Sequence, residues 1–280
     1  MISITDFTKQ SWVHDPRHGQ IFTLSLLVML GALWLDFGPQ PLQFLIALSA
    51  TLSTQYICYR FLHISSLDYR SPFITALGIT LLCRSNDLWV YALAGFLAIA
   101  SKFLIRVQGK HIFNPANFAI AALLLVTPNL LWVAPGQWGA TGWLAMLVLC
   151  CGMMVLTGAR RMDTTLLFMA CYGGLLFARA LYLGDPLTIP LRQLENVSLL
   201  IFAFFMISDP MSTPSRFSMR LLFVAAVSLL AFYIQFTLQI RPALILALFF
   251  ISPLTPLLDR LARGTPYSWQ HKNLTEGTAT

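Results

Sequence analysis

The chain has 280 residues, of which 57% are hydrophobic and only 10% are charged, and its formal net charge at pH 7 is +7. With so few charged side chains it cannot keep its apolar surface out of water as one soluble core, so we predict a polytopic membrane protein. The positive charge does not indicate nucleic-acid binding, because the cations lie in short connections between apolar runs, where they set membrane topology.

The N-terminal segment is polar and contains His14, Asp15, Arg17 and His18. It lacks the order of charge, apolar run and small-residue cleavage site that marks a signal peptide. We therefore expect residues 1–20 to be retained as a cytoplasmic N-terminal segment.

Ten apolar runs follow, at 21–38, 41–62, 71–83, 88–105, 115–134, 141–158, 164–184, 196–208, 219–238 and 242–258. Eight of them approach the roughly 20 residues that a helix needs to cross about 30 Å of hydrocarbon, whereas 71–83 and 196–208 are shorter. If all ten cross and the N-terminus is cytoplasmic, 14 of the 18 lysines and arginines lie on the inner side. Re-entrant short runs would instead place Lys102, Arg106 and Lys110 outside, against the positive-inside rule. The sequence thus predicts an all-α fold of ten transmembrane helices in the inner membrane, with both termini cytoplasmic.

The two short runs each take third place in a group of five, and an odd number of spans makes the two groups inverted copies. Weak sequence similarities between the two groups agree with this order. ITLLCRSN (79–86) resembles FFMISDP (204–210), and HIFNPANFAIAA (111–122) resembles QIRPALILALFF (239–250). We predict a first five-helix repeat at 21–134, a second at 141–258 and a cytoplasmic tail at 259–280. Short or broken helices at matched positions point to a site at the repeat interface.

The most polar seam is SKFLIRVQGKHIFNPANF (101–118). Gly109 allows a turn, and Pro115 fits the first turn of a new helix, so Asn114 stands at the capping position. This arrangement gathers His111, Asn114 and Asn117 at a helix N-terminus, whose free N–H groups and dipole suit an anion or a ring rich in acceptors. The simpler interpretation is a capped turn with solvated lysines.

A second polar turn, ISDPMSTPSRFSMR (207–220), ends the second short run. In the ten-span model it lies on the same face as the first seam, so Ser208, Asp209 and Pro210 are predicted to share a pocket with it. The alternative is that Asp209 only caps a turn that Pro210 ends. Arg220 is expected in a surface loop. If the two polar turns are only helix caps, the fallback position for the pocket is around Arg84, Ser85 and Asn86 on the opposite face.

Two segments, GKHIFNPANFAI (109–120) and FFMISDPMSTPSR (204–216), resemble motifs of a known protein family. From about residue 20 to 260, the chain resembles the family that contains the NqrB subunit of the sodium-pumping NADH:quinone oxidoreductase and the RnfD subunit of the Rnf electron-transport complex. The resemblance implies an inverted five-plus-five helix fold, a non-covalent riboflavin-type flavin between the halves, and membrane electron transfer with redox partner proteins and, in some members, quinone. By matching positions, it makes Asn114, Pro115, Asn117, Asp209 and Pro210 flavin-site candidates.

The chain departs from that family in one connection. Those two family members attach an FMN to a threonine of an S-G-A-T type motif in a long segment between the fifth and sixth helices. Here the connection is only APGQWGAT (134–141), in which Thr141 keeps the tail of the pattern but Trp138 replaces the serine or threonine. The resemblance therefore implies a shortened member that holds riboflavin or FMN non-covalently, with covalent FMN at Thr141 as the alternative.

The side chains of the seam have a chemistry that suits a flavin. Amides such as Asn114 and Asn117 can read the donors and acceptors of the pyrimidine edge, while apolar helices supply a slot for the benzenoid end. The cations Lys102, Arg106 and Lys110 could stabilise a reduced flavin or could anchor the chain at the membrane surface. His111 could relay protons near neutral pH or be a simple interfacial histidine.

Other kinds of site have no signature here. The chain contains no Walker loop, dinucleotide fingerprint or Ser/His/Asp order, so electrons must reach it from elsewhere, as in a subunit of a membrane oxidoreductase. The five cysteines lie in or beside apolar runs without C-x-x-C spacing and indicate buried small residues rather than a metal site.

Two other classes of function stay open. A transporter or channel, for example for a flavin, also uses inverted repeats and broken helices. Coupled carriers often place ionisable groups near span centres, but here Asp36 lies near the end of the first run and Arg179 in the last turns of the seventh. This scarcity favours a bound cofactor over a proton-coupled pathway, although a flavin carrier would not need such groups. A purely structural assembly subunit is the third possibility, which absence of flavin from the purified protein would favour.

Overall fold

The computed structural model describes residues 15–34, 40–64, 68–133, 142–262, 264 and 267, and this part of the chain is mostly helical. Its first half contains five helices, α2 (Pro16–Leu33), α3 (Pro41–Phe61), α4 (Arg70–Leu82), α5 (Leu88–Leu104) and α6 (Pro115–Val126). Its second half contains α7 (Gly142–Ala159), α8 (Met162–Leu183), α9 (Thr188–Leu194), α10 (Val197–Ile201), the π-helix η1 (Phe202–Met206), α11 (Phe217–Phe236), α12 (Ala243–Ile251), the 3-10 turn η2 (Ser252–Leu254) and α13 (Thr255–Leu261).

Each apolar run predicted from the sequence overlaps at least one of these helices, although several ends differ. The helix α2 begins at Pro16, inside the predicted N-terminal segment, because the Asp15 side chain accepts a hydrogen bond from the Arg17 N–H and so caps it. The helix α6 stops at Val126, earlier than expected. The helix α9 lies in a connection where no helix was predicted.

Four described segments are long and apolar enough to cross a membrane: Gly142–Ala159, Met162–Leu183, Phe217–Phe236 and Ala243–Leu261. The bent pair Thr188–Leu194 and Val197–Met206, which turns by 51°, makes a fifth if it is one span. Together with the composition, these segments make the chain a polytopic membrane protein. In the first half, α3 has 21 residues, but hydroxyl side chains interrupt its apolar surface. Thr51 and Thr54 donate to carbonyls of the preceding turn, which satisfies these hydroxyls inside the helix.

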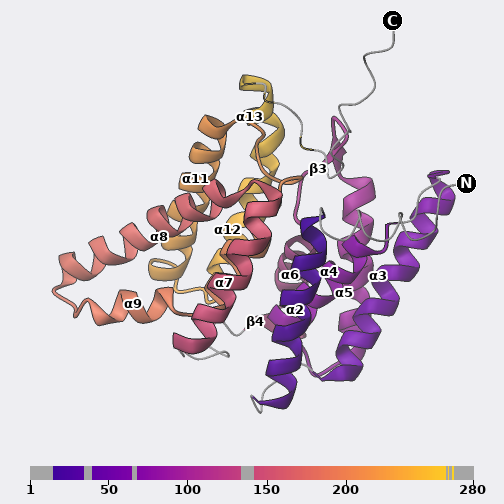
Figure 1. Cartoon of the computed structure of the whole chain (residues 1–280), viewed down its shortest axis with the longest axis horizontal. Coiled ribbons are helices and arrows are strands. Elements are labelled where there is room, and N and C mark those ends of the chain that lie inside the picture. The colour runs from indigo at the N-terminus through magenta and orange to yellow at the C-terminus, as the bar shows by residue number, and fades with distance from the viewer. Residues whose placement is uncertain are drawn as a thin grey trace, which may run out of the picture.

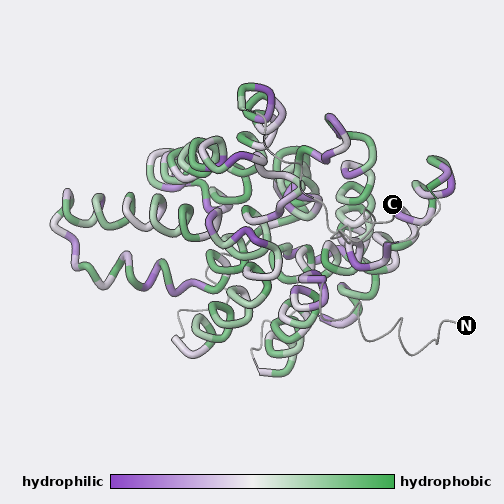
Figure 2. The backbone as a smooth tube through the Cα atoms, turned by 45° about the horizontal axis from the view of Figure 1, so that its top comes forward, coloured by the Kyte–Doolittle hydropathy of each residue, from purple (hydrophilic) through white to green (hydrophobic). Residues whose placement is uncertain are grey.

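Two short antiparallel ribbons mark the two ends of the molecule. The strands β2 (Arg106–Val107) and β3 (Lys110–His111) pair just before α6, and β1 (Cys83–Arg84) pairs with β4 (Trp132–Val133) beyond its other end. We call these the β3 end and the β4 end, at the top and bottom of Figure 1. Hydrophobic residues run along most of the helices between them, and hydrophilic residues gather mainly at helix ends and turns (Figure 2).

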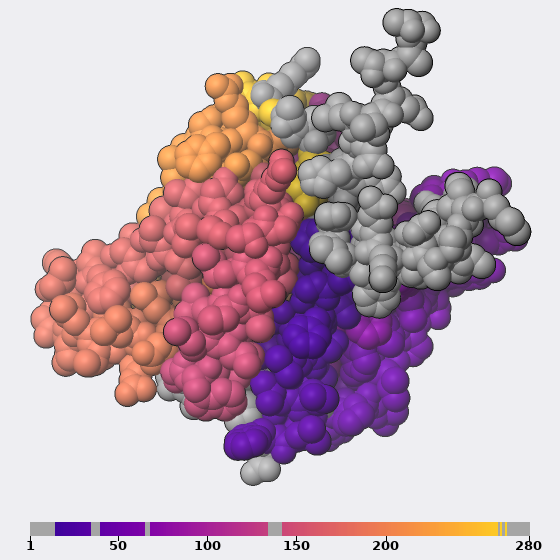
Figure 3. All heavy atoms as spheres, viewed as in Figure 1, coloured from indigo at the N-terminus to yellow at the C-terminus, as the bar shows by residue number. Residues whose placement is uncertain are grey.

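The two halves lie side by side (Figures 1 and 3). Between the halves, α2 packs on α7 and α6 packs on α12. Within them, α2 contacts α4 as α7 contacts α10, α3 contacts α5 as α8 contacts α11, and α5 contacts α6 as α11 contacts α12. The closest approach in the second half is at Gly152, where an added Cβ would lie 2.4 Å from a ring carbon of Phe204. That glycine lets α7 pack directly against η1.

Candidate ligand-binding site

The first wall of the site is the connection between α5 and α6. Gln108 and Gly109 adopt positive φ angles of 51° and 82°, which fold β3 back on β2 and place His111 opposite Arg106. Asn114 then caps α6, its Oδ1 accepting from the Asn117 N–H at 3.1 Å, with Pro115 in the first turn. The predicted turn, cap and helix start are therefore confirmed.

The second wall follows the π-helix η1, a type of helix that often marks functional sites. Asp209 forms a tight turn in which its Oδ1 accepts from the Met211 N–H at 3.0 Å and its carbonyl accepts from the Thr213 hydroxyl at 3.0 Å. Asp209 thus caps a turn, as the simpler interpretation of the sequence held. Its second carboxylate oxygen is left for another partner.

That partner comes from the other half of the chain. His111 Nε2 lies 3.3 Å from Asp209 Oδ2. Beside it, Lys110 Nζ forms an ion pair with Asp259 Oδ2 at 2.9 Å and donates to the Thr213 carbonyl at 3.0 Å. The two polar seams that the sequence predicted to converge are therefore in direct contact at the β3 end.

Asp209 is held in its ionised form. Burial acts to raise the pKa of its carboxyl group, but the hydrogen bond and charge of His111, and the N–H of Met211, outweigh burial and lower the pKa below the ordinary value of 3.8. A carboxylate kept charged this far from solvent can accept hydrogen bonds from a ligand in the same space.

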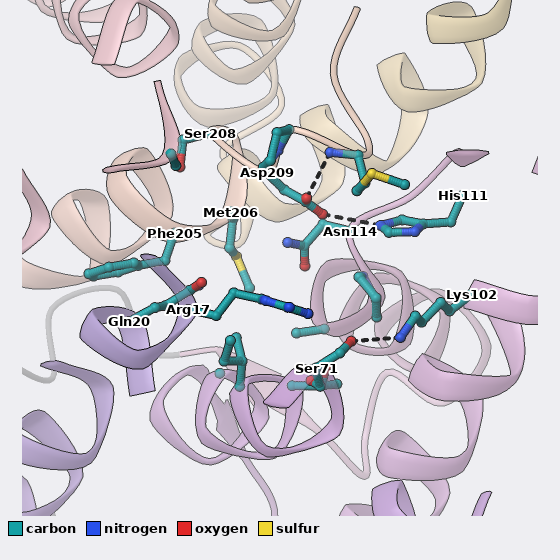
Figure 4. Close-up of a pocket in the computed structure, with 18 of the residues that line it drawn as sticks. Arg17, Gln20, Ser71, Lys102, His111, Asn114, Phe205, Met206, Ser208 and Asp209 are labelled. Atoms are coloured by element: carbon teal, nitrogen blue, oxygen red, sulfur yellow. Dashed lines mark hydrogen bonds and ion pairs between the residues drawn. The ribbon is translucent and has the colours of Figure 1, made fainter. Parts of the chain in front are cut away.

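Next to this contact lies a cavity of about 330 Å³ between the halves. Of the residues singled out from the sequence, it is lined by Lys102, Arg106, His111, Asn114, Pro115, Ser208, Asp209 and Pro210. Figure 4 shows Asn114 in the middle, with Asp209 and His111 on one side, Lys102 and Ser71 on another, and Phe205 and Met206 facing them from the second half. The second half therefore presents apolar side chains to the cavity, with Gln20 and Arg17 of the first half lying beside them.

Sequence reasoning missed the contribution of α2. Arg17, Gln20 and Leu24 line the cavity because α2 packs between α4 and α7. Arg17 bonds to both Asp15 and Asp68, which fixes the start of α2 at the cavity wall. The one available signal was the Asp-Pro pair at residues 15 and 16, which marks a helix start inside the polar N-terminal segment.

Asn117 is fully buried, and neither atom of its side-chain amide has a hydrogen-bond partner in the described part of the chain. It stands one turn below the cap but does not line the cavity. Thr141 lies outside the described residues. The fallback residues Arg84, Ser85 and Asn86 lie at the β4 end, away from this cavity.

The three cations of the first seam have different surroundings. Lys110 is committed to the contact between the halves, and Arg106 is exposed and donates to the Gly109 carbonyl at 2.7 Å. Lys102 is partly buried at the cavity wall, where its ammonium donates to Ser71 Oγ at 2.8 Å. The sequence could not separate these roles.

The expectation for Arg220 was wrong. It lies in α11 with only 9% of its surface exposed, its Nε donates to Asp163 Oδ2 at 2.9 Å, and its Nη1 donates to the Ser215 carbonyl at 2.6 Å. Arg220 thereby ties the turn after Asp209 to the start of α8, because the first turn of α11 faces inward.

A second cavity, of about 900 Å³, opens at the β4 end between the ends of α6 and α11. Its wall includes Ser198, whose buried hydroxyl has no partner in the described residues, together with Gln235 and Arg241. Leu82 lines both cavities.

With the geometry established, comparison with known proteins places the chain. Residues 135–268 match the model of the NQR2, RnfD, RnfE family. This segment is therefore similar to that family, which is the family that the sequence resembles. The matched segment contains Asp209 and Pro210 and the whole second half of the fold, whereas the Asn114 seam precedes it. No curated protein matches the chain.

Proposed function

We propose that the chain is a flavin-binding electron-transfer subunit of a membrane complex, which holds riboflavin or FMN non-covalently between two inverted halves. The observation that carries the proposal is the cavity at the β3 end, where Asn114 from one half and Asp209 from the other face the same space. The match of residues 135–268 to the NQR2, RnfD, RnfE family supports electron transport as the setting.

The residues present fit a flavin ring. The volume of about 330 Å³ lies within the range of ligand pockets, roughly 300–1,000 Å³. An isoalloxazine ring needs hydrogen-bonding groups along one edge, which Asn114 and Asp209 offer, and an apolar slot at the other end, which Phe205 and Met206 offer. The unpaired amide of Asn117 leaves one further donor and acceptor beside this wall.

Each group has a role that its chemistry allows. The flavin, when bound, supplies the ability to take up and release electrons, and the protein positions it and adjusts its potential. Asn114 presents an amide that its capping bond holds in place. His111, held against Asp209, is a group that can exchange a proton at Nε2 between the cavity and the β3 end.

An inverted arrangement of two five-helix repeats is part of the proposal. It is supported by the contacts between the halves, which join first helix to first helix and last helix to last helix, as a twofold axis requires. It is also supported by direction, since α6 begins at the β3 end while α12 begins beside the cavity at the β4 end. A reporter fused within 134–141 should then be external and one after Arg161 cytoplasmic. Finding both on one side would contradict the ten-span model.

The proposed partners are redox proteins, because the sequence contains no dinucleotide-binding motif of its own. Without a dinucleotide-binding motif it must receive electrons from redox partner proteins, and it passes them on to such proteins or to quinone in the inner membrane. Absorbance of the detergent-purified protein tests the proposal. Yellow colour that acid precipitation releases indicates non-covalent flavin, colour that stays in the pellet indicates attachment, as at Thr141, and a colourless folded protein contradicts flavin binding.

Transport of a small molecule such as a flavin is the second candidate. The observation that favours it is the pair of cavities at opposite ends, which share Leu82. A carrier predicts uptake of labelled riboflavin into proteoliposomes and ready loss of ligand on washing. An electron-transfer subunit predicts retained flavin, reversible reduction and no uptake. Folded protein with neither property would indicate an assembly subunit.

A further inference from the structure

Lys102 differs from the other cationic groups around the cavity at the β3 end. Arg17 is bonded to Asp15 and Asp68, and His111 lies against Asp209. Lys102 instead contacts only uncharged oxygens, Ser71 Oγ at 2.8 Å and Gln55 Oε1 at 3.4 Å. No salt bridge joins it to a carboxylate within the described ranges of the chain.

This position is costly for an ammonium group. Lys102 is partly buried, and its Nζ lies 5.5 Å from the centre of the Phe103 ring. A charge withdrawn from water and left without an opposite charge destabilises the fold unless other groups compensate for it. The C-terminal dipole of α5 compensates in part, since Lys102 lies in the last turn of that helix. The remaining positive charge is directed at the ligand space (Figure 4).

We infer that Lys102 makes the cavity bind the reduced, anionic flavin more tightly than the oxidised, neutral one. The inference rests on the proposed function. Two electrons and one proton convert the neutral oxidised ring into a reduced ring of charge −1, and a second proton would neutralise that charge. An unneutralised ammonium at the cavity wall favours the reduced ring of charge −1 over the doubly protonated, neutral one. The positive ammonium and the negative ring attract strongly where water is excluded.

The other charged groups near Lys102 are paired with each other or screened by solvent, so they do not replace its effect on the flavin. Those that face it or the same cavity are Arg17, Cys58, Tyr59, Asp68, Arg106, His111 and Asp209. Arg17 and Asp68 neutralise each other, as do His111 and Asp209 when the imidazole is protonated. Arg106 is exposed and screened by solvent. Lys102 is therefore the partly buried cation at this cavity whose charge no ion pair in the described residues neutralises.

The test is a redox titration of the purified flavin-loaded protein with dithionite, followed by absorbance at several pH values. For the wild type we expect the potential to fall by about 30 mV per pH unit, since one proton accompanies two electrons. Lys102→Met should weaken binding of the reduced flavin at least roughly tenfold more than that of the oxidised flavin, which lowers the potential by about 30 mV or more. Its slope should approach about 59 mV per pH unit, because the second proton then binds.

Two variants control for charge and folding. Lys102→Arg keeps the charge and should keep the potential and slope. Arg60→Met removes an exposed cation at the end of α3 and should also leave both unchanged. Oxidised flavin occupancy and the size-exclusion profile of each variant report on folding.

The outcomes separate the inference from the proposed function. If Lys102→Met holds flavin with the wild-type potential and slope, the inference is wrong while flavin binding stands. If it weakens both redox forms equally, Lys102 pairs with a fixed charge such as the phosphate of FMN, and the inference is again wrong. If the folded wild type carries no flavin and binds none that is added, the proposed function itself fails.

Discussion

Replacing Asn114 separates the two roles that the structure gives this residue. Its Oδ1 caps α6 by accepting from the Asn117 N–H at 3.1 Å, and its amide faces the cavity between the halves. Asn114→Leu removes both functions. Loss of the cap costs roughly 0.5–2 kcal/mol of stability. Loss of the amide as a hydrogen-bond partner of the flavin ring, in a pocket without water, costs about 1–3 kcal/mol of binding free energy. This corresponds to a roughly tenfold to hundredfold higher Kd.

Asn114→Ser makes the comparison decisive. Serine is a good capping residue, so this variant should keep the thermal stability of the wild type, but it has no amide and should still lose about tenfold or more in flavin affinity. The Kd is measured by the quenching of flavin fluorescence, and stability by thermal unfolding in detergent. If Asn114→Ser binds flavin as tightly as the wild type while Asn114→Leu does not, Asn114 is only a helix cap and the account of the site is wrong.

Three further changes test the packing and the charges. Gly152→Ala should destabilise the protein by about 1–3 kcal/mol, because the added Cβ would lie 2.4 Å from a ring carbon of Phe204, whereas Gly174→Ala has open space and should be neutral or stabilising; equal melting temperatures would contradict the packing. Arg220→Gln should cost roughly 1–3 kcal/mol in thermal unfolding, since buried hydrogen bonds to two segments are lost, and an unchanged melting temperature would restore the surface-loop interpretation. Because the pKa of Asp209 is lowered by folding, its contribution to stability is complete above pH 3.8 and is lost as the pH falls through the folded pKa. Asp209→Asn should flatten the acid limb of a stability profile as the pH falls below about 4, and an unaltered profile would show that Asp209 is not the group responsible.

Local signals in the sequence were sufficient where one short segment determines the structure. The Asn-Pro pair at residues 114 and 115 predicts both the cap and the first turn of α6, and Gly109 predicts the turn before it. Hydrophobicity alone located the helices of the ten apolar runs, but it did not predict α9. The meeting of His111 with Asp209 could be predicted from the order of the spans, because topology places both turns at one end.

Features that depend on packing between distant segments could not be predicted. Arg17 reaches the cavity only because α2 lies between α4 and α7, and no local pattern specifies that contact. Arg220 looked like a loop residue. The inward direction of the first turn of α11 depends on Asp163 of the neighbouring helix α8, which no local pattern indicates. The roles of the seam cations were likewise undetermined, because only the fold decides that Lys110 meets Asp259 while Lys102 faces the cavity.

Flavin release by acid, compared between the wild type and one variant in each half, tests the central claim most directly. The purified wild type should be yellow, and acid precipitation should move the colour into the supernatant. Asn114→Leu and Asp209→Leu should each retain the size-exclusion profile of the folded protein and lose most of the flavin, because their side chains face one cavity from opposite halves. Folded variants that both keep full flavin occupancy would contradict a flavin site between the halves.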